Sequence, residues 1–87
     1  MRVVADPKIG LAPLHISFDV QVPTEVLQGG RCLWTDNDEP FSNSPTGQRI
    51  ITSPGDHILC VIVQTRDHHE YRAWTTVNVL SPQPEIR

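Results

Sequence analysis

The feature that most constrains the fold is a long apolar run directly after a turn, at residues 53–63, which read SPGDHILCVIV. Pro54 and Gly55 are strong turn residues. An apolar, β-branched run bounded by such residues is typical of a buried strand. It is far shorter than the ~20 apolar residues that a membrane helix needs. Because 87 residues provide one modest core, we predict that this strand crosses that core.

The rest of the chain consists of short strand-like runs separated by turn residues. The run 14–20 alternates between apolar and polar residues, as a half-buried strand does. No stretch carries an apolar repeat of helical length. The predicted strands are 2–5, 14–20, 31–35, 48–52, 57–65 and 71–80, with a loop at 36–47 and a hairpin loop at 66–70.

This pattern predicts an all-β fold, an Ig-like antiparallel β-sandwich of two sheets and about seven strands. A five-stranded barrel is the alternative. In the sandwich, Trp34 would lie between the sheets. The sandwich would span residues 1–80, and residues 81–87 (SPQPEIR) would form a Pro-rich linker or tail.

Charge and motifs exclude several classes of function. The formal net charge is -3 and the basic residues are scattered, which argues against a nucleic acid or an anionic membrane as partner. We expect no signal peptide, because strand-like residues follow Met1 at once, and we interpret the chain as a module of a larger protein. No catalytic motif is present, so we expect no enzymatic activity.

Three segments, in order, resemble the PKD (polycystic kidney disease) domain. VVADPKIGLAPLHISFDV resembles its opening, with a Gly-x-x-Pro-Leu turn and a strand ending in Phe-Asp. CLWTDNDE resembles its Tyr-x-Trp-Asp-Phe-Gly-Asp-Gly stretch, with Trp34 and Asp38 at matching positions. SPGDHILCVIVQTRD resembles its Pro-Gly-x-Tyr-x-Val-x-Leu-x-Val-x-Asp strand, with His57 at the Tyr position. The resemblance covers Val3 to Val79 and implies an Ig-like accessory module of an extracellular or cell-surface protein.

Aligned in this way, the long strand is apolar on both faces, which predicts that both are covered. The inward residues would be His57, Leu59, Val61 and Val63. The outward residues would form an exposed apolar interface with neighbouring strands, at Leu33, Ile58, Cys60, Ile62 and Trp74. Its occupant would be a neighbouring domain, another protein, or a sugar stacked on Trp74. A strand phase wrong by one residue would exchange the two faces.

The remaining candidate groups have simpler interpretations. Cys32 and Cys60 would point to opposite faces of one sheet as free thiols, unless the phase of one strand is wrong and they form a disulfide. Asp36, Asp38 and Glu39 offer oxygen ligands of the kind calcium prefers, although a solvated turn is the favoured interpretation. Residues 67–70 (DHHE) suggest a solvent-facing hairpin tip more than a zinc site.

The sequence therefore predicts a non-catalytic interaction or spacing module that requires no cofactor. The expected partner is a neighbouring domain or another protein. A carbohydrate-binding module using Trp74, and a calcium-dependent adhesion unit, are the alternatives.

Overall fold

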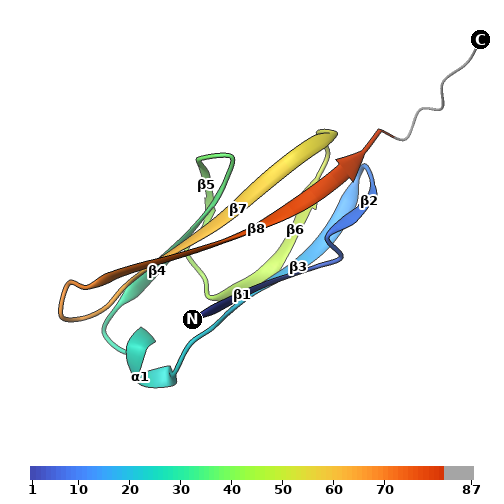
Figure 1. The fold of residues 1–87 in the computed structure, drawn as a ribbon. Helices are drawn as coiled ribbons and strands as arrows, with labels where there is room; N and C mark the ends of the chain where they lie inside the picture. Colours follow the sequence, from blue (N-terminus) through green and yellow to red (C-terminus); the bar gives the residue numbers. More distant parts are fainter. Residues whose placement is uncertain (82–87) are drawn as a thin grey trace, which may run out of the picture.

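Eight strands form two sheets in the computed structural model, which describes residues 1–81 (Figure 1). The predicted all-β, Ig-like sandwich is confirmed, with one strand more than expected. The elements are β1 (Arg2–Asp6), β2 (Ile9–Leu11), β3 (Leu14–Gln21), α1 (Thr24–Leu27), β4 (Arg31–Asp36), β5 (Glu39–Ser42), β6 (Thr46–Ile51), β7 (Gly55–Gln64) and β8 (Glu70–Leu80).

The smaller sheet has the order β1-β3-β6, and the larger sheet has the order β2-β8-β7-β4-β5. All pairs are antiparallel except β2 with β8, which is parallel. The apolar run of residues 57–63 lies in β7, the central strand of the larger sheet, between β8 and β4. The core covers the inner face of β7, whereas among residues 1–81 no further layer covers its outer face, on which Ile58 is exposed.

The core lies between the inner faces of the two sheets. Trp34 is fully buried there, with its ring centroid 4.8 Å from that of Phe18. Phe41 packs edge-on against Phe18 at 5.3 Å. On β7 the inward residues are buried as predicted, namely His57, Leu59, Val61 and Val63. The strand phase inferred from the sequence is therefore correct.

The predicted loop at 36–47 is wrong. Asp36 ends β4, a two-residue turn follows, and β5 and β6 occupy most of the remainder. Both turn residues have positive φ, 49° at Asn37 and 72° at Asp38, as a type I′ hairpin turn requires. The density of turn-forming residues thus marks a tight hairpin rather than one long loop.

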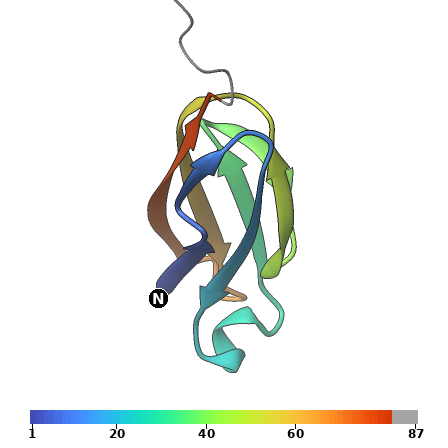
Figure 2. The ribbon, with the colours of Figure 1, turned by 90° about the vertical axis from the view of Figure 1, so that its right-hand side faces the viewer.

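Two small elements were not expected. β2 adds a parallel edge strand beside β8, and α1 is a single turn of four residues between β3 and β4. Figure 2 shows α1 at one end of the sandwich. No helix among residues 1–81 is long and apolar enough to cross a membrane. Of the predicted Pro-rich tail, residues 82–87 lie outside the described residues.

Candidate functional site

The predicted interface residues share the outer face of the larger sheet. Leu33 on β4 pairs with Ile62 on β7, and Cys60 on β7 pairs with Trp74 on β8. Trp74 is 59% exposed, Ile58 49% and Leu33 37%, while Ile62 is half-buried. We call Leu33, Ile58, Ile62 and Trp74 the outer apolar patch. Among the described residues, no further layer covers it, since the helix lies at one end of the sandwich.

Cys60 does not belong to the exposed part of this face, contrary to the sequence prediction. It points outward between Thr35 on β4 and Trp74 on β8, but it is only 7% exposed. Its small side chain lies on the middle of three neighbouring strands, with Thr35 on one side and Trp74 on the other. Burial raises the pKa of the Cys60 thiol, with a smaller opposing effect of Arg72 and a further rise from Asp38. Although the strand register directs Cys60 outward, its thiol is buried and is therefore not a reactive surface thiol.

The two cysteines are free, as predicted. Cys32 pairs with Val63 and Cys60 pairs with Thr35, so the two thiols lie on opposite faces of the same sheet. Cys32 faces the core and Cys60 the outer face. Burial also raises the pKa of the Cys32 thiol. Neither thiol has the low pKa of a nucleophile.

Asp36 belongs to a polar cluster between the sheets rather than to a calcium loop. Its carboxylate accepts hydrogen bonds from Nε and a terminal nitrogen of Arg49, both at 3.2 Å. It also contacts Nδ1 of His57 at 2.8 and 3.0 Å. Asp38 and Glu39 are exposed beyond it. Among the described residues no group of three or more His, Cys, Asp and Glu comes together to hold a metal ion, so the three calcium candidates do not form one ligand set.

This cluster links the two sheets. Arg49 comes from β6 of the smaller sheet, whereas Asp36 and His57 belong to the larger one. The guanidinium of Arg49 also lies 4.2 Å from the centre of the Phe41 ring. Nε2 of His57 lies 2.7 Å from the Ser53 carbonyl oxygen, so both ring nitrogens face acceptors. A neutral imidazole can donate to one of them, and an imidazolium to both.

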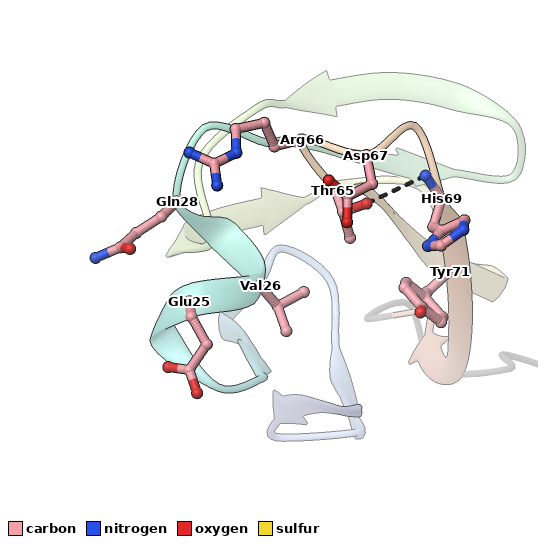
Figure 3. A pocket seen from close by; sticks show the side chains of 8 residues that line it. All are labelled: Glu25, Val26, Gln28, Thr65, Arg66, Asp67, His69 and Tyr71. Carbon is pink, nitrogen blue, oxygen red and sulfur yellow. Dashed lines mark hydrogen bonds between the residues drawn. The ribbon is translucent and has the colours of Figure 1, made fainter.

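A separate hollow of about 280 Å³ lies between α1 and the hairpin that joins β7 to β8 (Figure 3). Val26 points into it from the helix, and Tyr71 lines the opposite side from β8, next to His69. Its lining residues are Glu25, Val26, Gln28, Thr65, Arg66, Asp67, His69 and Tyr71. The DHHE segment is exposed at the hairpin, as predicted, and it forms one rim of this hollow.

Neither the cluster nor the hollow is predicted by the sequence. Asp36, Arg49 and His57 are distant in sequence, and only the pairing of β4 with β7 and the packing of the sheets bring them together. For the hollow, the sequence carries one weak signal, the acidic Glu25 directly after Pro23 and Thr24, since acidic residues favour the first turn of a helix. This signal locates α1, but not the hairpin that packs beside it.

Comparison with known proteins extends the fold assignment. The structure is similar to the fibronectin(III)-like modules of Clostridium thermocellum CbhA, with a TM-score of 0.63 and 19% sequence identity over 91% of this chain and 96% of that chain. At this identity the likeness shows the fold alone, an Ig-like β-sandwich. No protein-family model matches the chain, and no curated protein matches it.

Proposed function

We propose that the chain is a non-catalytic accessory module that packs through its outer apolar patch against a neighbouring domain or a partner protein. The observation that carries this proposal is the exposure of Trp74, Ile58 and Leu33 on adjacent strands of one sheet face. Contiguous exposed apolar side chains of this kind mark interaction sites in soluble proteins. An exposed tryptophan within such a patch is a typical anchor of an interface.

Other features support a structural role. The fold resembles that of fibronectin(III)-like modules, and the polar cluster of Asp36, Arg49 and His57 is used to join the two sheets. The motifs shared with PKD domains support a place in that family or a related one, and with it an extracellular or cell-surface location. In such a protein the module would space or orient the domains beside it.

Quenching of Trp74 fluorescence by acrylamide tests the proposal. Trp34 is fully buried, so the difference between the wild-type protein and the variant Trp74→Phe reports Trp74. We expect strong quenching in the isolated module and weak quenching in a natural chain that carries the module with its neighbours. Equal quenching in both, with no partner that protects Trp74, would show that the patch stays open and would contradict docking.

Carbohydrate binding on the sheet face is the second candidate, favoured by the 59% exposure of Trp74. A flat aromatic ring presents an apolar surface on which the ring of a sugar can stack. In this case Trp74 would remain accessible to acrylamide in the longer chain, and a glycan would protect it. The same quenching experiment, repeated with soluble oligosaccharides, therefore separates the two candidates.

A further inference from the structure

A hydrogen-bonded hairpin forms one wall of the hollow beside α1. Across the hairpin, the Thr65 amide donates to the His69 carbonyl at 2.8 Å, and the His68 amide donates to the Thr65 carbonyl at 3.0 Å. The His69 amide also donates to the Thr65 hydroxyl at 3.1 Å (Figure 3). These bonds close the hairpin on the side of the hollow. A wall that is already hydrogen-bonded needs less ordering when a ligand enters.

The segment after α1 forms the opposite wall and packs closely against this hairpin. Gly29 has a φ of +71°, and a Cβ added there would lie 2.9 Å from Cδ of Arg66. The stem of Arg66 therefore lies directly over Gly29. A Cβ on Gly30 would lie only 2.4 Å from the Gln64 carbonyl oxygen. The two glycines let the segment after α1 approach the hairpin closely, which fixes the width of the hollow.

The lining combines an apolar platform, formed by Val26 and Tyr71, with hydrogen-bond donors and acceptors. Tyr71 lies on the same, inward-facing side of β8 as the buried Val77, yet it is 48% exposed. Val26 and Tyr71 also line a second, smaller hollow of about 120 Å³ with Met1, Val22 and Pro23. Around this platform Glu25 and Asp67 offer acceptors and Arg66 offers donors. Within residues 1–81, none of these three charged side chains forms an ion pair or a side-chain hydrogen bond.

We infer that this hollow binds one residue of a neutral sugar, independently of the docking role of the outer patch. A pyranose ring has an apolar face that suits Tyr71 and Val26, and hydroxyl groups that both donate and accept. Two carboxylates on the lining disfavour an anion, and the nearby guanidinium disfavours a cation. The described residues supply no metal-ligand group. A volume of about 280 Å³ is close to the lower limit of small-molecule sites, ~300 Å³, which fits a single sugar residue.

The test is a titration of the whole ¹⁵N-labelled protein followed by two-dimensional NMR. The probes are methyl glucoside, N-acetylglucosamine and the β-1,4-linked oligomers of each. We expect saturable shifts confined to residues 24–30 and 65–71. Tighter binding of the oligomers than of the monosaccharides would identify a polysaccharide or glycan as the source, and equal binding would identify a free sugar.

Matched variants locate the site. Tyr71→Ala should weaken binding about tenfold, as loss of an aromatic platform does, and Asp67→Asn should weaken it several-fold. Tyr71→Phe keeps the platform and should bind almost as well as the wild type, which controls for folding. Trp74→Ala should have no effect. Absence of saturable shifts with every probe would overturn the inference. Binding lost in Trp74→Ala but kept in Tyr71→Ala would also overturn it and would assign the sugar to the sheet face.

Discussion

At the scale of single residues, Asp36 makes the most consequential contacts. Its side chain is 4% exposed, and it faces Arg49 and His57 across the interior. Removing one member of a buried ion pair leaves its partner without compensation, at a cost of ~3–5 kcal/mol. We expect Asp36→Asn to lower the free energy of unfolding by about 3 kcal/mol, the lower end of that range, because Arg49 is 30% exposed.

Urea unfolding followed by tryptophan fluorescence measures this loss. The exposed pair of Glu70 and Arg72, with side chains 47% and 51% exposed, provides a matched control. Glu70→Gln should lower the free energy of unfolding by less than about 1 kcal/mol, as the loss of other surface ion pairs does. Equal and small losses for Asp36→Asn and Glu70→Gln would mean that the interior cluster does not hold the sheets together.

The two thiols predict how stability depends on alkaline pH. Burial raises the pKa of Cys32 and of Cys60 in the folded protein, so folding favours the protonated thiols. Their contribution is complete below the ordinary thiol pKa and is lost as pH rises through the raised values of the folded state. The free energy of unfolding should therefore fall with pH across this range, measured by urea titrations. The free energy of unfolding of the double variant Cys32→Ala and Cys60→Ala should fall less steeply with pH. An unchanged slope would refute the role of the thiols.

At the scale of elements, the turn between β4 and β5 is held by one side chain. Asn37 Nδ2 donates to the Asp56 carbonyl at 3.1 Å, and Asn37 Oδ1 accepts from the Ile58 amide at 2.9 Å. The Asn37 amide donates to the Ile58 carbonyl at 3.0 Å. The side chain thus prolongs the pairing of β4 with β7 past the end of β4. Asn also tolerates the positive φ of this position better than most residues do.

We expect Asn37→Ala to lower the free energy of unfolding by about 2 kcal/mol. Each of the two lost side-chain hydrogen bonds contributes roughly 1 kcal/mol, and the positive φ, which alanine tolerates poorly, adds a smaller amount. Asn37→Gly restores the backbone freedom but not the hydrogen bonds, so it separates the two effects. Hydrogen exchange at the Ile58 amide should become faster in both variants. Unchanged protection of this amide in Asn37→Ala would show that the side chain does not anchor the turn.

The elements also show what could be predicted from the sequence. β3 and β7 were found because alternation or an apolar run is a property of adjacent residues. β5 was missed because Pro40 and the surrounding turn residues conceal a short edge strand. The outward phase of Cys60 was predicted correctly but its burial was not, since that depends on the neighbouring strands. The cluster around Asp36 depends on contacts between the two sheets, for which the sequence carries no local signal.

At the scale of the whole molecule, the two candidate surfaces lie in different places. The outer apolar patch covers the middle of the larger sheet, whereas the hollow lies at the end that carries α1, the β7–β8 hairpin and Met1 (Figure 1). A neighbour seated on the sheet face would therefore leave the hollow open. The arrangement allows one module to be fixed in a larger protein and still bind a small ligand.

The outer apolar patch also predicts the behaviour of the isolated module. In a solution of the isolated module the patch can be shielded from water only by a second copy, so we expect weak self-association that increases with protein concentration. Trp74→Glu should abolish this self-association in a sedimentation-velocity series, because a charge within the patch opposes its burial. The stability of this variant should stay within about 0.5 kcal/mol of the wild type, since Trp74 is 59% exposed. Tyr71 is another exposed aromatic residue, 48% exposed and outside the patch, so Tyr71→Glu should leave self-association unchanged. If Trp74→Glu associates as strongly as the wild type, the contacts between copies lie elsewhere and the patch loses its support as a docking surface.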